Sequence, residues 1–449
     1  MPLTRDADTI AAIATPPGVG GIGVVRVSGA SLSDLINGIV GGALSLRHAT
    51  YTRFLARSGE TLDEGIAIYF AAPSSYTGED VLELHGHGGR AVMRLLLERC
   101  LELGARIAEP GEFTRRAYLN GKLDLAQAEA VADLIAASTA EAARGALRSQ
   151  QGEFSTACEE LIDRLIELRA WVEGSLDFPE EQIDAQGEPR LSRMLGDIQG
   201  RLDALLALAR QGRLLREGLS VAIIGRPNVG KSSLLNCLAT AGVSIVTDIP
   251  GTTRDVIREQ LQIDGVPINI VDTAGLRKAE GEVERIGIER AWAEIRRADV
   301  VVLVLEAPRG TWEEDGAICA RIPSEIPIIR VFNKIDLLDI APSLEQRDGA
   351  VGVRLSAKTG AGIELLRSTL LDAAGWQAAE EGVFTARRRH LRALEKARQC
   401  LGDARLQIHQ CELFAEELRL AQEALASIGG EFAADDLLGE IFSKFCIGK

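Results

Sequence analysis

The sequence predicts a multidomain protein of mixed α+β and α/β class, in which an α/β domain interrupts a helical domain. The first 120 residues are rich in Gly and β-branched residues, which favour turns and strands. Residues 123–177 contain no Pro and little Gly, and Ala, Leu, Glu and Arg dominate there with apolar residues at helical spacing. The helical signature returns at residues 385–427, and strands alternate with helices between the two helical stretches.

In the first domain, two kinds of pattern predict regular structure. Runs rich in β-branched residues or with alternating character predict strands at residues 21–28, 64–70 and 81–85. Helical periodicity predicts a helix at residues 91–103. We therefore expect an N-terminal α+β domain.

Long amphipathic helices are expected on both sides of the α/β domain. Before it they cover residues 123–177 and, after a Pro/Gly break at 187–189, residues 191–210. After it they cover residues 385–427. Because the two stretches share one composition, we expect them to form one discontinuous all-α domain.

The inserted domain contains apolar runs that predict buried strands of a parallel sheet. These runs are residues 220–224, 268–271, 300–305 and 326–332. The expected domains are the N-terminal α+β domain, the first helical part, the inserted domain and the second helical part, at residues 1–120, 121–217, 218–373 and 374–449.

The length and the charge of the chain limit its architecture and its partners. At about 150 residues per domain, a chain of 449 residues suggests about three domains. Lys and Arg number 50 and Asp and Glu number 65, so the net charge is −15. A chain this acidic does not coat nucleic acid by bulk charge, so any contact requires a local basic patch or a partner protein. The basic run 387–390 is either such a patch or a solvated helix face.

Cysteine usage and hydropathy indicate the compartment. The seven cysteines are odd in number and none forms a C-x-x-C pair, so neither a disulfide framework nor a zinc ribbon is predicted. Residues 1–8 lack the features of a signal peptide, and no apolar run reaches the roughly 20 residues of a membrane span. We therefore expect a cytoplasmic protein with no membrane partner.

A phosphate-binding loop follows the first strand of the inserted domain. Residues 225–232 match G-x-x-x-x-G-K-[ST] between a predicted strand and an apolar helix start, which is the context that this motif requires. Gly225 and Gly230 permit tight turns that direct backbone N–H groups at phosphate oxygens. Lys231 is expected to contact the β and γ phosphates as a catalytic residue, and the Ser232 hydroxyl is expected to bind Mg²⁺.

Three further segments follow in the order that a GTPase needs. The run D-T-A-G starts at Asp272, whose carboxylate can hold the Mg²⁺ shell, and its Gly N–H can sense the γ phosphate. The run N-K-I-D ends at Asp336, whose carboxylate can accept the two donors that guanine offers and adenine lacks. The run S-A-K at 356–358 supplies a backbone N–H for the guanine oxygen. Together they predict a Ras-like P-loop G domain.

Two positions in the G domain concern hydrolysis itself. Thr253 can complete the coordination of Mg²⁺ when its loop closes over the γ phosphate. Leu276 stands where Ras-type enzymes use Gln to position the attacking water, and Leu cannot orient water. Acidic candidates for that task lie just downstream, at Glu280, Glu282 and Glu284. A solvated acidic turn is the alternative for any one of them.

Motifs outside the G domain match a single family over the whole chain. They are D-T-I (8–10), A-T-P-P-G (14–18), Y-T-G-E-D (76–80), G-H-G-G (86–89), P-G-E-F-T (110–114), N-G-K-L-D-L (120–125) and the terminal C-I-G-K (446–449). With these motifs, the chain resembles the MnmE (TrmE) family of tRNA modification GTPases. The resemblance implies a homodimer formed through the N-terminal domains and a helical domain that the G domain interrupts.

The resemblance also implies how hydrolysis is activated. G domains would dimerise in the presence of K⁺, which replaces an arginine finger. The expected K⁺ ligands are Asn228 and loop carbonyls at Thr247, Ile249 and Thr252. Glu284 matches the catalytic residue that orients the attacking water. The residues expected to bind GTP are Asn228, Val229, Gly230, Lys231, Ser232, Ser233, Thr247, Asp248, Ile249, Pro250, Gly251, Thr252, Thr253, Asp272, Thr273, Ala274, Gly275, Asn333, Lys334, Ile335, Asp336, Ser356, Ala357 and Lys358.

By the same resemblance, the N-terminal domain binds 5-formyl- or 5,10-methylene-tetrahydrofolate. Arg26, Glu83, Lys122 and Lys449 match the folate-contacting positions, and a surface salt bridge is the alternative for each of them taken alone. Cys446 matches the functional thiol of the family and is expected to be catalytic. A lone Cys is more often an inert buried residue.

The reaction that the resemblance implies modifies the wobble uridine (U34) of certain tRNAs. A carboxymethylaminomethyl or aminomethyl group is added at C5, together with a flavoprotein partner, MnmG, which carries FAD and NADH and makes most of the contact with tRNA. The alternative is a GTP-dependent switch in ribosome assembly without modification chemistry, which Cys446 and the folate-matching residues disfavour. A membrane-associated signalling GTPase is disfavoured because the terminal C-I-G-K has no aliphatic residue at its third position.

Overall fold

The computed structural model of the chain describes residues 8–177, 187–241, 258–272, 289, 292–307, 316, 319–347, 350–377, 382–430, 435–443, 445 and 448. The chain divides into two compact units. One unit comprises Met1–Ala132, Ser149–Ile198 and Lys396–Lys449, and the other comprises Asp133–Arg148 and Gln199–Glu395. The four domain boundaries expected from the sequence remain a prediction.

The N-terminal α+β domain is built on a six-stranded sheet with the order β3-β4-β5-β2-β1-β6. β1 pairs with β6 in parallel, and the other neighbouring strands are antiparallel. The elements are β1 (Ile10–Ile13), β2 (Gly23–Gly29), α1 (Ser33–Val40), β3 (Thr50–Leu55), β4 (Thr61–Phe70), β5 (Asp80–Gly86), α2 (Arg90–Glu102), β6 (Arg106–Ile107) and α3 (Glu112–Leu119). The expected strands and helix are β2, β4, β5 and α2, whereas periodicity did not identify the others.

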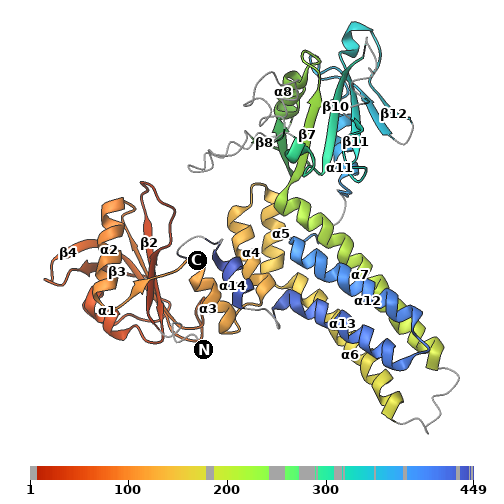
Figure 1. The fold of residues 1–449 in the computed structure, drawn as a ribbon. Helices are drawn as coiled ribbons and strands as arrows, with labels where there is room; N and C mark the ends of the chain where they lie inside the picture. Colours follow the sequence, from red (N-terminus) through yellow and green to blue (C-terminus); the bar gives the residue numbers. More distant parts are fainter. Residues whose placement is uncertain are drawn as a thin grey trace. The chain divides into compact units, whose positions relative to one another are not determined.

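The two faces of this sheet have different surroundings. α1 and α2 lie against one face (Figure 1), and their apolar side chains form a core with residues such as Val25 and Leu82. Because side chains alternate along a strand, Arg26 of β2 and Glu83 of β5 lie on the opposite face. Phe113 of α3 packs on that opposite face with apolar residues of β1.

The helical regions carry apolar stripes at helical spacing. They consist of α4 (Leu125–Ala136), α5 (Ala140–Gln150), α6 (Glu153–Asp177), α7 (Gly187–Glu217), α12 (Arg388–Leu406), α13 (Cys411–Gly429) and α14 (Asp435–Ser443). α6 and α13 lie side by side (Figure 1), and the buried leucines Leu161, Leu165 and Leu168 form a stripe along α6. α14 packs against α3, where the rings of Tyr118 and Phe442 are 6.4 Å apart.

One expectation about the helices is wrong in detail. α7 already begins at Gly187, so the segment 187–189 starts a helix instead of breaking one. Pro189 lies in the first turn, where a missing N–H costs no intrahelical hydrogen bond. The stretch 385–427 forms two helices, because residues 407–410 separate α12 from α13.

The inserted α/β domain is built on a seven-stranded sheet with the order β12-β13-β11-β10-β7-β9-β8. The two edge pairs, β12 with β13 and β8 with β9, are antiparallel, and the central strands are parallel. Its elements are β7 (Leu219–Gly225), α8 (Lys231–Ala241), β8 (Arg258–Ile263), β9 (Val266–Asp272), β10 (Val300–Glu306), β11 (Ile328–Asn333), the 3₁₀ helix η2 (Ile335–Leu337), β12 (Ser343–Arg347), β13 (Ala350–Arg354) and α11 (Ile363–Ala373).

Both faces of this sheet are buried, which explains why its central strands are continuously apolar. Leu234 of α8 and Leu366 of α11 contribute to the core on one face. Trp292 and Ile295 contribute to the core on the other face. Parallel strands covered on both faces need apolar side chains in both directions. The mixed α+β, helical and α/β architecture expected from the sequence is confirmed.

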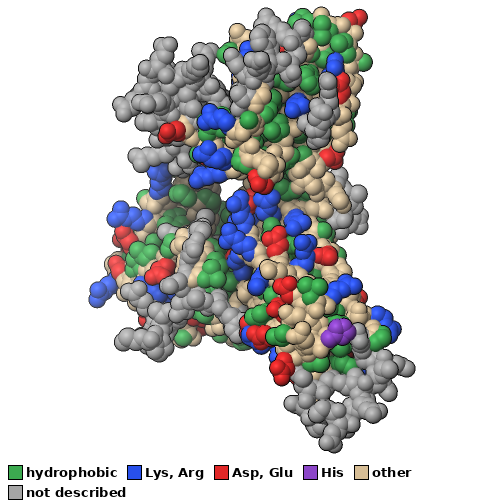
Figure 2. Space-filling model, turned by 45° about the vertical axis from the view of Figure 1, so that its right-hand side comes forward, with side chains coloured by type: hydrophobic (Ala, Val, Ile, Leu, Met, Phe, Trp, Pro, Cys, Tyr) green, Lys and Arg blue, Asp and Glu red, His purple; other side chains and the backbone are tan. Residues whose placement is uncertain are grey.

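The surface, the cysteines and the helices add three observations. Figure 2 shows Lys and Arg side chains interspersed with Asp and Glu side chains on one face of the molecule. No disulfide joins the cysteines that the structure describes. Within the described ranges, no helix is both long enough and apolar enough to cross a membrane.

Candidate functional site

The phosphate-binding loop lies between the carboxyl end of β7 and the start of α8. Its backbone has positive φ at Gly225 (148°), Asn228 (66°) and Gly230 (97°). A Cβ atom at Gly225 would lie 2.5 Å from the carbonyl oxygen of Val304, and one at Gly230 would lie 2.3 Å from Nδ2 of Asn333. Both glycines are therefore required by conformation and by close packing.

The first turn of α8 presents the polar groups expected to contact phosphate. The Lys231 ammonium donates hydrogen bonds to the carbonyl oxygens of Gly225 and Arg226, each at 2.8 Å, so its charge lies over the loop. Ser232 and Ser233 follow on the exposed side of the helix. A helix N-terminus with unpaired N–H groups favours anions, so this turn can receive phosphate oxygens.

Asn333 joins three loops at the carboxyl edge of the sheet. It is the last residue of β11 and its side chain is buried. Its amide nitrogen donates to the carbonyl oxygen of Val229 in the phosphate loop at 2.8 Å. Its Oδ1 atom accepts from the N–H groups of Lys334 at 2.8 Å and Ala357 at 2.9 Å. One buried amide thus fixes the phosphate loop against the two segments expected to contact guanine.

The Asp336 carboxylate is exposed and oriented by a neighbouring hydroxyl. The buried Ser356 donates to Oδ1 of Asp336 at 2.6 Å. A carboxylate offers about four lone pairs, so Asp336 keeps capacity for the two donors of guanine. Lys334 adopts φ of 69°, and its ammonium pairs with Glu306 of β10 at 2.6 Å. Sequence patterns alone did not identify Glu306, because it is not part of any of the G-domain motifs.

The structure leaves part of this site undescribed. Asp272 ends β9 and stands in register with Ile223 of the neighbouring strand β7, so its backbone lies at the same edge of the sheet as the phosphate loop. The expected site residues that lie outside the described residues are Thr247, Asp248, Ile249, Pro250, Gly251, Thr252, Thr253, Thr273, Ala274, Gly275, Glu284, Cys446 and Lys449.

In the N-terminal domain, Arg26 and Glu83 form a direct pair. The two residues stand opposite each other in the antiparallel register of β2 and β5. Nε and Nη2 of Arg26 donate to the same oxygen of Glu83, at 3.0 and 2.8 Å. The guanidinium carbon lies 5.6 Å from the centre of the Tyr76 ring and 5.9 Å from that of Phe113. Two charged residues 57 positions apart are thus held together on one face of the sheet.

Two other expected or neighbouring residues contact either the loop that carries Tyr76 or Glu83 itself. The exposed Lys122 donates from its ammonium to the carbonyl oxygen of Pro73 at 3.2 Å, in the loop that carries Tyr76. His85 lies 3.2 Å from the second oxygen of Glu83. Sequence analysis did not assign Tyr76, Phe113 or His85 to the site. For His85 a signal existed, because alternation along the strand places it on the same face as Glu83.

Buried charges support the same face of the N-terminal sheet. Glu112 and Arg116 of α3 are fully buried, and Arg116 pairs with Glu112 at 3.1 Å and with Glu79 at 3.0 Å. Arg106 pairs with Glu112 at 2.7 Å. Burial by itself would raise the pKa of Glu112, but hydrogen bonds from Arg106, the Glu109 N–H and Arg116 together lower this pKa below its ordinary value. The Glu112 carboxylate is therefore ionised at neutral pH.

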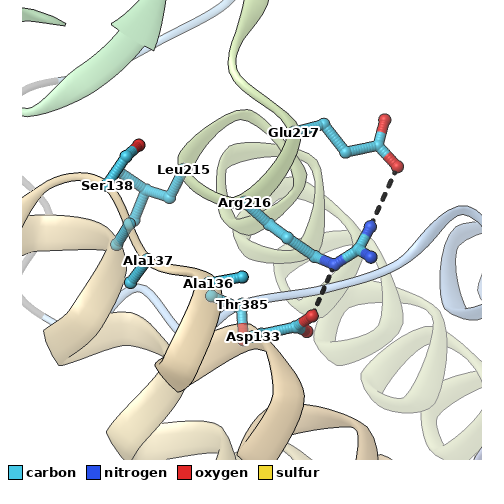
Figure 3. Close-up of a pocket in the computed structure, with 9 residues that line it drawn as sticks. Asp133, Ala136, Ala137, Ser138, Leu215, Arg216, Glu217 and Thr385 are labelled. Carbon is cyan, nitrogen blue, oxygen red and sulfur yellow. Dashed lines mark hydrogen bonds and ion pairs between the residues drawn. The ribbon is translucent and has the colours of Figure 1, made fainter. Parts of the chain in front are cut away.

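A separate cavity lies where α4, α7 and the segment before α12 meet. Its volume is about 270 Å³. As Figure 3 shows, Arg216 reaches Asp133 at 2.8 Å and Glu217 at 3.2 Å. Arg387 also pairs with Asp133, at 2.7 Å, and Arg388 pairs with Glu217 at 3.2 Å. Arginines of the basic run 387–390 are thus engaged in ion pairs within the chain.

The fold and the nucleotide site first define a class. A phosphate loop, an N-K-I-D run and an S-A-K run joined by one buried asparagine at the carboxyl edge of a parallel sheet are the arrangement of a P-loop guanine nucleotide-binding protein. Comparison with known families narrows this class. Residues 125–446 match the MnmE helical domain, and residues 9–122 match the N-terminus of the GTP-binding protein TrmE. The chain therefore belongs to the MnmE (TrmE) family.

Individual relatives agree with this assignment. The tRNA modification GTPase MnmE of Nitrosomonas europaea is 56% identical, over 98% of this chain and 99% of the relative. The tRNA modification GTPase MnmE of Azoarcus sp. is 59% identical, over 99% of each chain. Among solved structures, Aquifex aeolicus Era bound to GDP·AlF₄⁻ is similar over 40% of this chain and 66% of that chain, with 27% identity and a TM-score of 0.28.

Proposed function

We propose that this chain is a GTP hydrolase that acts in tRNA modification. The observation that carries the proposal is the buried side chain of Asn333, which joins the phosphate loop to the segments 334–336 and 356–358. Family membership and relatives named tRNA modification GTPase MnmE support the same role. The nucleotide site is assigned to GTP because Asp336 accepts hydrogen bonds from guanine, whereas adenine would present an acceptor to it.

For hydrolysis, the residues of this chain bind and orient the reactants. Lys231 moves from the loop carbonyls to the β and γ phosphates, and backbone N–H groups at the start of α8 hold the phosphate oxygens. Glu284 orients the attacking water. The Ser232 hydroxyl, Thr253 and the Asp272 carboxylate would supply hard oxygen ligands that suit Mg²⁺. When Mg²⁺ is bound with the nucleotide, it would neutralise part of the phosphate charge.

A K⁺ ion would bind at the phosphate loop and take the role that an arginine finger has in other GTPases. The amide of Asn228, at the exposed turn of the loop, and the carbonyl groups of Thr247, Ile249 and Thr252 are oxygen donors that suit such a cation. Dimerisation of the G domains would complete the site. This part of the proposal rests on the family resemblance and on the position of Asn228.

For the modification chemistry, we assign the one-carbon donor to the N-terminal domain. Arg26, Glu83, Lys122 and Lys449 would bind 5-formyl- or 5,10-methylene-tetrahydrofolate, and the contact of Arg26 with Glu83 supports a built site there. Cys446 would supply the thiol. The product is a carboxymethylaminomethyl or aminomethyl group at C5 of the wobble uridine (U34).

The proposal also includes partners, compartment and domains. The chain would form a homodimer through its N-terminal domain and act in the cytoplasm with MnmG, a flavoprotein that carries FAD and NADH. tRNA would bind mainly through that complex, which agrees with the net charge of −15 on this chain. The domain division at residues 120, 217 and 373 belongs to the same proposal.

The test is complementation of a strain that lacks this gene, with nucleoside analysis of its tRNA by mass spectrometry. The wild-type chain should restore the modified wobble uridine, and Lys231→Ala should not, because hydrolysis fails. Cys446→Ser should hydrolyse GTP at the wild-type rate and still fail to restore the modification. If the tRNA of the deletion strain were normal, the proposed function would be wrong. If Cys446→Ser restored the modification fully, the thiol would have no chemical role.

A further inference from the structure

The end of strand β10 carries a carboxylate that none of the G-domain motifs includes. β10 is continuously apolar from Val300 to Leu305, and Glu306 is its last residue. Glu306 stands in register with Asn333 of β11, and the Ala307 N–H donates to the carbonyl oxygen of Asn333 at 2.8 Å. β10 lies between β11 and β7 in the sheet. Glu306 therefore lies at the carboxyl edge, between the strand that leads into the phosphate loop and the strand that leads into the N-K-I-D run.

The partner of this carboxylate is Lys334, whose backbone conformation is unusual. Lys334 has φ of 69°, a left-handed conformation that costs energy for any residue with a Cβ atom. Its N–H donates to Oδ1 of Asn333 at 2.8 Å, and its ammonium donates to Glu306 at 2.6 Å. The backbone and the far end of the lysine are thus each held by a separate side chain. A lysine held only by its backbone would sample many rotamers.

The conformation of Lys334 affects the direction of Asp336. The two residues lie in one short turn, because Lys334 precedes the 3₁₀ helix η2 and its carbonyl oxygen accepts from the Leu337 N–H at 3.1 Å. Asp336 is exposed and accepts from Ser356 at 2.6 Å. Hydrogen bonds weaken steeply when they are misaligned, so a carboxylate recognises guanine well only when it faces the donors of the base. A change of conformation at residue 334 is therefore expected to turn Asp336 away from those donors.

The charges of Glu306 and Lys334 also depend on each other. An uncompensated carboxylate at the edge of the sheet that receives a nucleotide would repel the phosphates of that nucleotide. The side chain of Glu306 is 20% exposed and that of Lys334 is 29% exposed, so solvent screens the pair less than it screens a pair on the open surface. Removing one member of such a pair is expected to weaken nucleotide binding more than removing both members.

We propose that Glu306 is a positioning residue for guanine recognition that acts through Lys334. Its carboxylate fixes the ammonium of Lys334, which keeps residues 334–336 in their left-handed turn and directs the Asp336 carboxylate at the donors of the base. Glu306 itself need not touch the nucleotide. The inference rests on the proposed function, because it names a residue that sets the specificity of the same GTP site.

The deciding variant is Glu306→Gln, which keeps the length of the side chain and removes its charge. Its matched control is Glu345→Gln, because Glu345 of β12 forms an ion pair with Arg354 of β13 in the same sheet. Lys334→Met, alone and combined with Glu306→Gln, completes a double-mutant cycle. The affinities of the purified full-length proteins for GTP, inosine triphosphate and ATP are measured, together with steady-state GTP hydrolysis and urea unfolding.

Inosine triphosphate lacks only the exocyclic amine of guanine, so the ratio of the affinities for GTP and inosine triphosphate reports how well Asp336 faces the base. For Glu306→Gln, we expect the affinity for GTP to fall about tenfold and this ratio to fall about threefold or more. KM for GTP should rise while kcat stays at the wild-type value, because Asn333 still holds the phosphate loop.

The other variants separate positioning from a general effect. In the Lys334→Met background, Glu306→Gln should leave the affinity for GTP unchanged or increase it, because it then removes a charge that has lost its partner. Glu345→Gln should match wild type in the affinities for all three nucleotides.

Three results would overturn the inference. An unchanged ratio of the two affinities in Glu306→Gln would show that this carboxylate does not position Asp336. Equal losses of affinity for all three nucleotides, together with a lower urea midpoint, would show a general structural role. A loss in the Lys334→Met background as large as in the wild-type background would show that Glu306 does not act through Lys334.

Failure of the proposed function would be visible in the wild-type protein alone, before any variant is compared. If the wild-type protein did not prefer GTP over ATP, the GTP site would be wrong and this inference would fail with it. If the wild-type protein preferred GTP and Glu306→Gln kept the full preference over inosine triphosphate, only the inference would fail.

Discussion

The nucleotide site and the site around the Arg26–Glu83 pair, called here the Arg26 site, are assembled in opposite ways. In the nucleotide site, short runs of sequence end strands at one edge of a parallel sheet, and the sheet brings 225–232, 333–336 and 356–358 together. In the Arg26 site, single residues from distant strands and from the end of the chain meet, with separations of 57 and 422 positions. Chemistry carried by local runs is visible in a sequence, whereas the single residues of the Arg26 site could be named only through the family resemblance.

The first prediction alters the base that the nucleotide site recognises. Asp336→Asn should lower the affinity for GTP by on the order of 10³-fold and create a preference for xanthosine triphosphate, because the amide can donate to the oxygen at C2 of xanthine. Ser356 can still donate to the remaining oxygen of residue 336. Nucleotide affinities are measured by competition with a fluorescent GTP analogue. The control is Asp339→Asn, an exposed position nearby. Continued preference for GTP would refute the guanine assignment.

The second prediction removes the amide that joins the loops of the same site. Asn333→Ala leaves the Val229 carbonyl and the Ala357 N–H without their partner, and each such loss costs about 1–3 kcal/mol. The inserted domain should unfold at a lower urea concentration, and GTP affinity should fall with it. Urea unfolding and nucleotide binding are the measurements. An unchanged urea midpoint would show that the sheet alone holds the loops in place.

The third prediction concerns the cation. GTP hydrolysis should be on the order of tenfold faster in K⁺ than in Na⁺ at equal ionic strength, because a larger cation suits loop carbonyls and the amide of Asn228. Asn228→Ala should remove most of this difference while GTP binding persists. Phosphate release is followed in both salts. Equal rates of the wild-type protein in both salts would contradict the K⁺ site. An arginine would then have to stabilise the phosphate charge during hydrolysis, with Arg254 and Arg277 as the first candidates.

The fourth and smallest effect concerns the buried charges behind the Arg26 site. The folded-state pKa of Glu112 lies below its ordinary value, so the ionised carboxylate stabilises the fold above the unfolded pKa, and this contribution is lost as pH falls through the folded pKa. Glu112→Gln should therefore destabilise the protein at pH 7, with a smaller difference from wild type at acid pH. Urea unfolding at pH 7 and below pH 4 measures this. Glu109→Gln, at a more exposed neighbour, is the control. A pH-independent difference would mean that packing, and not charge, explains the loss.

Secondary structure was predictable where the pattern was long or strongly apolar. The strands at 220–224 and 300–305 form β7 and β10, because a strand buried on both faces has a continuous apolar run. β6 has two residues, too few to show alternation, and exists because it pairs with β1. The start of α7 was missed because Pro and Gly at 187–189 suggest a break, although Pro is tolerated in a first helical turn.

The sequence by itself determined the family and the order of the G-domain motifs, and it predicted the residues that contact guanine, because each motif carries its chemistry within a few adjacent positions. Only the tertiary structure decided that Asn333 reaches the phosphate loop, that Arg26 pairs with Glu83 and that its guanidinium also holds Gly448. The physical reason is strand register. Which residues of two strands stand opposite each other depends on turns, bulges and core packing along the whole sheet, and no local pattern encodes the result.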